Sequence, residues 1–378
     1  MSERAYPNWP EVELGDICEF AYGKSLTADT RTGSGFPVFG SNGQVGFHEK
    51  ALTESETIII GRKGSFGEIH YSSNPCFPID TTYYITKKQT KVHLPWLARR
   101  LRCLGLEKLN RAAAIPGLNR ADAYRQKLLL PPLDEQKRIA EILDAADALR
   151  AKRREALAQL DALLQSTFLD MFGDPVTNPK GWKIGRLADV VKRLDGGQNV
   201  AQSETETQYR ILKVSAVTLG QYHPEESKYL PEDFFVPESY LVKKGDLLIS
   251  RANTTELVGT TAYVWQTPQN IVLPDKIWKF IWKECAVVEP IFIYHLSQNP
   301  KFRRVIENLA TGTSGSMKNI TKSKLLSIPI PLPPLSLQRR FAAIVEGVER
   351  QKARMRAHGA ELDALFASLQ SRAFNGEL

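Results

Sequence analysis

The sequence predicts an α+β protein made of two similar mixed α/β domains and two long antiparallel coiled-coil helices, arranged as a pseudo-twofold internal repeat. Three observations predict this class. The 378 residues are enough for two or three domains. The stretch PPLDEQKRIAEIL, which begins at Pro131, returns as PPLSLQRRFAAIV at Pro333, 202 positions later. Each copy follows short β-like runs and leads into a long helical pattern.

Four segments are expected from the repeat, and they alternate between domain and helix. The two domains differ in length, because 122 residues separate Trp9 from Pro131 and 151 separate Trp182 from Pro333. The length between the tryptophan and the proline pair has therefore diverged between the two halves, while the motifs at both ends are kept. The expected bounds are 1–132 for the first domain, 133–175 for the first helix, 176–333 for the second domain and 334–378 for the second helix.

Short strands are expected inside both domains. Each domain opens with an extended segment after its tryptophan, WPEVELGDICEF in the first and WKIGRLADVVKRL in the second. Each also has a β-like run that ends at an arginine, Arg62 in ETIIIGRKGSFG and Arg251 in GDLLISRANTTELVG. The stretch RLDGGQNV is expected to be a turn beside a strand. In DKIWKFIWKE, the alternation of Trp278 and Trp282 with lysines indicates a strand with a buried face rather than a stacking platform.

The segments after the two proline pairs are predicted to be helices. Prolines end the preceding strand, and Asp134 and Ser336 are suitable N-cap residues. Gly173 suits a left-handed C-cap after the first helix. Apolar residues in alternating steps of three and four predict a heptad seam, with one helix packed against the other. The expected seam is Ile139, Ile142, Ala146, Leu149, Arg153, Ala156, Leu160 and Leu163, with Phe341, Ile344, Val348, Gln351, Met355, His358, Leu362 and Leu365 as counterparts.

Composition and charge narrow the class of protein. No run of about 18 apolar residues is present, which argues against a membrane span. The N-terminal stretch lacks a signal-peptide core, and four cysteines without a CxxC pair indicate reduced thiols in a cytoplasmic protein. The net charge is +8, with +4 in the first domain and +5 in the second. Two basic blocks suit a polyanion contacted at two places, although a mildly basic solvated surface would give the same count.

Taken together, these motifs resemble the specificity subunit of a type I restriction-modification system. The resemblance covers essentially the whole chain and is carried by PPLDEQKRIAEIL with MFGDP, and by NITKSKLLSIPIPLPPLSLQRRF with LQSRAFNGEL. It implies two target recognition domains, each reading half of a split double-stranded DNA sequence. It also implies helices that fix the spacing between half-sites and dock DNA adenine methyltransferase subunits. ATP-dependent restriction subunits would then complete the complex.

The residues themselves favour a protein without catalysis or cofactor. The sequence contains no GxGxxG after a strand, no GxxxxGK[ST] loop, and no Asn-Pro-Pro-aromatic or Asp-Pro-Pro-aromatic motif for adenine methylation. The six histidines show no metal-ligand spacing. Two other hypotheses stay open: a stand-alone DNA-binding protein or regulator that acts without a methyltransferase, and an enzyme with an unfamiliar site.

Candidate DNA contacts are polar residues in loops at the ends of strands. Arginine can fork onto guanine and asparagine onto adenine, whereas cations at fixed positions suit phosphates. An alternative is that Arg62 and Arg251 belong to turns and pair with nearby carboxylates. The loops near the end of each domain, which contain Asn119 and Lys318, could equally be tight connections or part of a docking surface for a partner. The candidates are Ser41, Asn42, Gln44, Arg62, Lys63, Ser65, Asn119 and Arg120 in the first domain, and Arg251, Asn253, Ser314, Ser316, Lys318, Asn319 and Lys322 in the second.

Overall fold

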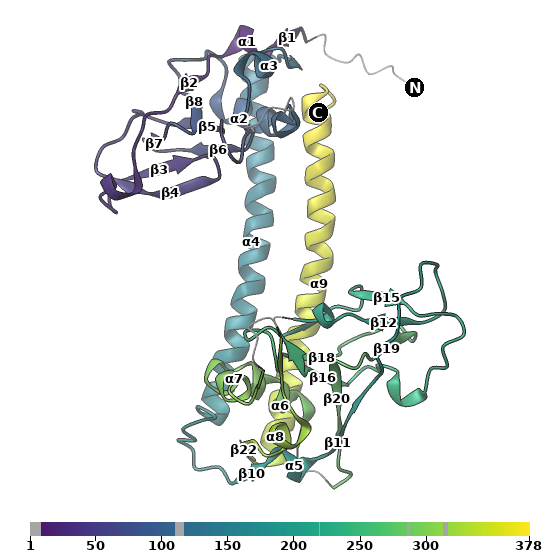
Figure 1. Ribbon diagram of the computed structural model, residues 1–378. Helices are drawn as coiled ribbons and strands as arrows, with labels where there is room; N and C mark the ends of the chain where they lie inside the picture. The colour runs from purple at the N-terminus through teal and green to yellow at the C-terminus, as the bar shows by residue number, and fades with distance from the viewer. Residues whose placement is uncertain (1–8, 110–116, 219, 286–287, 313–316) are drawn as a thin grey trace. The chain divides into compact units, whose positions relative to one another are not determined.

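The computed structural model describes residues 9–109, 117–218, 220–285, 288–312 and 317–378 (Figure 1). The chain divides into two compact units. Unit 1 consists of residues 1–154 and 356–378, and unit 2 of residues 155–355. Each unit holds one β-rich domain and a segment of both long helices, so the expected α+β class with two similar domains is confirmed.

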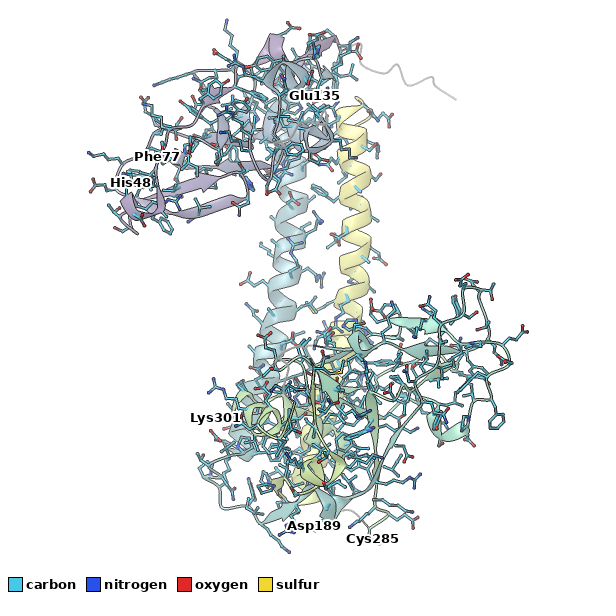
Figure 2. The ribbon with its side chains drawn as sticks, in the orientation of Figure 1. His48, Phe77, Glu135, Asp189, Cys285 and Lys301 are labelled. Carbon is cyan, nitrogen blue, oxygen red and sulfur yellow. The ribbon has the colours of Figure 1, made fainter. Side chains whose placement is uncertain are left out.

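Unit 1 contains a four-stranded antiparallel sheet in the order β2-β8-β5-β6. A second sheet, β4-β3-β7, pairs β3 with β4 antiparallel and with β7 parallel. Beside this sheet the His48 imidazole packs edge-on against the Phe77 ring, with 5.9 Å between centroids (Figure 2). The strands are β2 (Ala21–Tyr22), β3 (Phe36–Gly40), β4 (Gly43–His48), β5 (Thr57–Gly61), β6 (Ile69–Ser72), β7 (Phe77–Pro78) and β8 (Thr82–Ile85).

Unit 2 repeats both sheets with the same strand order. Its four-stranded sheet runs β11-β20-β16-β18 and its three-stranded sheet β15-β12-β19, again with one antiparallel and one parallel pairing in the smaller sheet. The internal repeat expected from the sequence is therefore present strand by strand. The strands are β11 (Val191–Gly196), β12 (Arg210–Leu212), β15 (Ser227–Tyr229), β16 (Leu247–Ser250), β18 (Thr261–Tyr263), β19 (Ile271–Val272) and β20 (Ile277–Trp282).

Further paired elements frame each domain. In unit 1, β1 pairs with β9, and in unit 2, β10 pairs with β22. A one-turn helix follows β1 and β10, and in unit 2 Asp189 accepts from the Arg186 amide at 2.7 Å to cap it (Figure 2). These elements are β1 (Glu11–Glu13), α1 (Leu14–Ile17), α2 (Leu94–Cys103), α3 (Arg120–Tyr124) and β9 (Lys127–Leu129); then β10 (Ile184–Arg186), α5 (Leu187–Val190), α6 (Pro290–Gln298), α7 (Pro300–Glu307), α8 (Lys322–Leu326) and β22 (Pro329–Pro331).

A glycine stands at the same place in both domains, just after β2 and β11. A Cβ added to Gly23 would lie 2.0 Å from the Ile79 carbonyl oxygen, and one added to Gly197 would lie 1.7 Å from that of Leu273. Both positions therefore require a residue without a side chain. The stretch RLDGGQNV continues β11 through Gly196, and Gly197 allows the backbone to pass this carbonyl closely.

The long helices are α4 (Leu133–Phe172) and α9 (Leu335–Phe374), each of 40 residues and so about 60 Å long. The predicted stop is confirmed, because Gly173 has a φ of +78° directly after α4. The predicted N-cap at Asp134 is wrong. The Gln136 amide donates to the Pro132 carbonyl, so Pro132 is the N-cap residue and the helix begins at Leu133. The Asp134 side chain is 98% exposed.

A buried glutamine holds each domain to the start of its own long helix. Gln136 accepts from the His93 amide at 2.8 Å and donates to the Pro131 carbonyl at 2.8 Å. Gln338 does the same in unit 2, where it accepts from the Glu289 amide at 2.9 Å and donates to a proline carbonyl at 2.7 Å. His93 and Glu289 precede α2 and α6, so each glutamine joins the N-terminus of a domain helix to that of a long helix. This explains the glutamine in the repeated motif.

The two long helices run antiparallel within each unit. In unit 1, Ile139 and Leu143 share a core with Phe374. In unit 2, the Phe168 and Phe172 rings lie against Phe341, with centroids 5.5 and 5.4 Å away. Aromatic packing also joins these rings to the domain helix α6 through Phe292.

The predicted heptad seam is wrong at several positions, because residues expected inside are exposed. Leu149, Leu163, Ile344 and Leu365 are 56, 50, 38 and 52% exposed, although all four were expected inside. The inward face instead advances in steps of four and then three. It buries Leu143, Leu164, Val345 and Lys352 at 0, 3, 0 and 5% exposure. Leucines occur in both the predicted and the observed register. In the observed register, Leu143 and Leu164 pack into the cores of the two units.

Candidate nucleic-acid interface

Three loops of unit 1 meet at the carbonyl oxygen of Thr81. The backbone amides of Arg62 and Lys63 donate to it at 2.9 and 3.2 Å, and the Ser41 hydroxyl donates to it at 2.6 Å. The loop before α3 joins them, because the Leu118 amide donates to the Arg62 carbonyl at 2.9 Å. Candidates spread over almost 80 residues of sequence are thus gathered into one surface.

The centre of this surface is the exposed ring of Tyr22. The Arg62 and Arg120 guanidinium carbons lie 4.9 and 5.4 Å from its centroid, and Tyr22 itself is 50% exposed. In the described part of the chain, each guanidinium group makes one long hydrogen bond to a carbonyl oxygen, and Arg62 also lies beside Tyr83. Arg62 donates to the Asp80 carbonyl at 3.3 Å and Arg120 to the Phe20 carbonyl at 3.4 Å. Most of their donors remain available for a ligand.

Two of the phenols near the arginines, those of Tyr83 and Tyr124, add no negative charge at neutral pH. Burial raises the pKa of Tyr83, which lies next to Tyr22, and burial also raises the pKa of Tyr124 beside Arg120. Both phenols therefore stay protonated. Two like charges held over one ring, without a carboxylate paired to either among the described residues, form a site that favours an anion.

Unit 2 carries the same arrangement around Trp278. The Arg251 guanidinium carbon lies 5.6 Å and the Lys322 amine 5.4 Å from its ring centroid. Arg251 is more firmly held than Arg62, because it donates to the Asp275 carbonyl at 2.7 Å and pairs with the Asp275 carboxylate at 3.5 Å. The alternative of an arginine paired with a neighbouring carboxylate thus describes Arg251 in this structure. Lys322 donates to the Leu194 carbonyl at 2.6 Å.

The remaining candidates of unit 2 lie on a two-stranded ladder beside Arg251. The ladder pairs β17 (Ala252–Asn253) with β21 (Lys318–Asn319), so Asn253 lies opposite Lys318. Lys318 donates to the Gly312 carbonyl at 2.7 Å, and the Asn253 side-chain oxygen accepts from the next amide. Ser314 and Ser316 lie outside the described residues.

The other candidates of unit 1 differ in how exposed they are and in whether the fold already uses their side chains. Asn42 and Gln44 are exposed at the β3–β4 hairpin, and Lys63 is exposed beside Arg62. Ser65 is half-buried, and its carbonyl oxygen would lie 2.1 Å from a Cβ on Gly61. Asn119 is the N-cap of α3, where its side-chain oxygen accepts from the Ala121 amide at 2.8 Å. This oxygen is engaged in the fold, as expected of a tight connection.

Sequence reasoning missed Tyr22, and it placed Trp278 on a buried strand face without linking it to the cations of unit 2. Tyr22 and Tyr83 are cross-strand neighbours on β2 and β8, and in unit 2 Gly196 and Trp278 take the matching places. A Cβ on Gly196 would lie 2.7 Å from the Trp278 ring, so the glycine leaves room for the indole. Trp278 is 7% exposed, which confirms the expected buried strand face.

Neither a metal centre nor a membrane span is found in the ranges that the structure covers. No group of three or more His, Cys, Asp or Glu side chains there is placed to hold a metal ion. No helix in the same ranges has the length and apolar character needed to cross a membrane.

Comparison with known proteins identifies a family. Residues 6–159 and 179–362 match the family model described as "Type I restriction modification DNA specificity domain". The type I restriction enzyme EcoEI specificity subunit of Escherichia coli is 28% identical over 179 residues, which is 46% of this chain and 30% of that protein. The MjaVIII specificity subunit of Methanocaldococcus jannaschii is 22% identical over 378 residues, 92% of this chain and 87% of that protein.

Solved structures share the fold. The crystal structure of a type I restriction-modification system S subunit from M. genitalium has a TM-score of 0.64 at 14% identity, and the match covers 99% of this chain and 98% of that one. A chain from a structural study of complex assembly and conformational transition of the type I R-M system has a TM-score of 0.55 at 18% identity over the full length of both chains.

Proposed function

Because this chain belongs to the family of type I restriction-modification DNA specificity domains, we propose that it reads a bipartite DNA target for a type I restriction-modification complex. Each β-rich domain reads one half-site. The separation of the two domains then sets the gap between the half-sites. Linking two weak readings in one chain raises the effective concentration of the second and makes the split target specific.

The observation that carries this proposal is the repeated pair of cations over an aromatic ring. Arg62 and Arg120 in unit 1, and Arg251 and Lys322 in unit 2, come from matching loops and face one ring each. Such pairs suit the phosphates that position a protein on DNA. The neighbouring exposed polar residues, such as Asn42, are then placed to contact base edges in the major groove.

The long helices serve two purposes in this proposal, as spacer and as docking surface for methyltransferase subunits. Leu163 and Leu365 stand 202 positions apart, and both are about half exposed, at 50 and 52%. A docking surface that includes these two positions would occur twice in the chain, and so it would suit two copies of one partner. The partner methyltransferases would extract and methylate an adenine in each half-site, and restriction subunits would cleave. This chain itself would catalyse neither reaction.

Partner dependence tests the proposal against a stand-alone DNA-binding protein. The full chain, alone and with its methyltransferase subunits, would be used to select duplexes from a randomised DNA library. We expect two short specific blocks around an unspecified gap, selected by the complex at least tenfold more tightly than by the chain alone. One contiguous motif bound equally well without the methyltransferase would contradict the proposal and support the stand-alone alternative.

A further inference from the structure

Unit 1 has a charged cluster in the seam between its helix segments. Arg150 of α4 donates to the Asp147 carboxylate on its own helix at 2.8 Å and to the Asp363 carboxylate on α9 at 2.6 Å. The Arg150 guanidinium carbon also lies 4.5 Å from the centroid of the Phe366 ring on α9. One cation thus links the two helices by both charge and ring contact.

Unit 2 has the same cluster with the two helices exchanged. Lys352 of α9 pairs with Glu349 on its own helix and with Asp161 on α4, at 2.5 and 2.7 Å. Each of these three residues stands 202 positions from its counterpart in unit 1. We call the two groups the seam clamps; each contains a cation, an acid three residues earlier on the same helix, and an acid on the opposite helix.

The charged side chains of the seam clamps are partly buried. The two helices can therefore pack stably only if these charges stay paired. The Lys352 side chain is 7% exposed and that of Glu349 15%, while Arg150 is 24% exposed. An ammonium group at this burial is destabilising unless it keeps its carboxylate partners. A charged residue at a seam position can therefore select one pairing of two helices over others, as polar seam residues do in coiled coils.

A slip of one heptad would leave neither cation with a carboxylate from the opposite helix. In one direction, Lys352 would face Arg154 and Arg150 would face Arg356, so that like charges meet in both places. In the other direction, the facing residues would be Phe168 and Gln370, which bear no charge. The observed pairing is therefore favoured, and both neighbouring heptad registers are disfavoured, by the same two cations.

We propose that the seam clamps select the register of α4 against α9 and so determine the gap between the two half-sites. This inference rests on the proposed function. Gln136 holds the first domain to the start of α4, and Gln338 holds the second to the start of α9. In this proposal each domain moves with the helix that holds it, so we expect a change of register to change the gap between the half-sites. One heptad of slip moves a helix by about 10 Å, which corresponds to about three base pairs of duplex.

The test places like charges in both clamps through the double variant Asp161→Lys with Asp363→Lys. Spin labels at Gln165 and Ala343, after replacement of Cys103 and Cys285 by serine, report the helix register without DNA. We expect one narrow distance distribution in the parent and a broad or double one in the variant. With the methyltransferase present, we expect methylation at the parental gap to fall at least tenfold and targets with a gap changed by about three base pairs to gain it.

Two further variants keep the result decisive. Adding Arg150→Glu and Lys352→Glu restores opposite charges across both seams, and we expect the single distance and the parental gap to return. Arg138→Leu is the matched control, because Arg138 pairs with Glu135 on the same helix and with no residue of α9 in the part of the chain that the structure describes. If the like-charge variant fails to fold, Asp161→Asn with Asp363→Asn carries the same test at the parental side-chain volume.

The possible outcomes separate this inference from the proposed function. An unchanged distance distribution in the like-charge variant would overturn the role of the clamps in register. A changed distribution with an unchanged gap would overturn the link between register and spacing. A parent that reads no split target would overturn the proposed function alone, since the spin-label distances would still test the clamps.

Discussion

Replacing Arg62 and Arg120 by alanine is expected to weaken binding of the assembled complex to its target by about 10²- to 10⁴-fold. Each guanidinium over Tyr22 has most of its N–H donors available to bind DNA. A hydrogen bond to a charged group contributes about 1.5–3 kcal/mol. If both contact phosphates, the slope of log K against log salt should fall by about two. Fluorescence anisotropy titrations across a salt series measure both quantities.

The controls for this prediction come from both units. Lys127→Ala removes a cation of unit 1 that is paired with Glu11 on the surface, and it should change neither affinity nor salt slope. Arg251→Ala with Lys322→Ala should also weaken binding but by less, because Arg251 and Lys322 already contact Asp275 and the Leu194 carbonyl, and the loss should be confined to contacts in the other half-site. A loss below about threefold, with the salt slope unchanged, would show that the Tyr22 surface does not contact DNA.

Replacing Gln136 by leucine is expected to lower the free energy of unfolding of unit 1 by about 2–4 kcal/mol. The change would leave the buried Pro131 carbonyl and the partly buried His93 amide without partners, and a fully buried group left in this way costs about 1–3 kcal/mol. Urea unfolding of the full chain, followed by tryptophan fluorescence, measures the loss. The same change at Gln338 should destabilise unit 2 to a similar extent.

The matched control is Gln159→Leu, an exposed glutamine of α4 that bonds only to Glu155 in the described structure. Its effect should stay within about 0.5 kcal/mol. A Gln136 variant as stable as this control would mean that the glutamine does not hold the domain to the helix.

The architecture was predictable because its signals are local. A proline pair followed by a helical run is read directly from the chain, and finding it twice predicts a repeat without knowledge of any contact. The seam register was not predictable in the same way. Leu149 and Leu163 fit one heptad and Leu143 and Leu164 fit another, and only packing against the domains decides between them. Charged residues such as Lys352 then lie inside, where a hydrophobic pattern does not place them.

The candidate site was likewise only partly predictable from the sequence. Arg62, Arg120, Arg251 and Lys322 could be named from their matching places in the two halves. Their convergence on one ring could not, because it depends on pairings between strands about 60 residues apart, such as Tyr22 with Tyr83. Insertions in the second domain also hide the match between these strands in the sequence.

Base-resolution mapping of DNA methylation, in host cells with and without this gene, tests the central claim most directly. The account predicts methylated adenines in two short specific blocks around a gap of one length, and their loss when the gene is removed. Restoring the gene with Arg62→Ala and Arg120→Ala should leave that methylation lost or strongly reduced. An adenine methylation pattern that is the same with and without the gene, in cells that express the methyltransferase subunits, would contradict the claim.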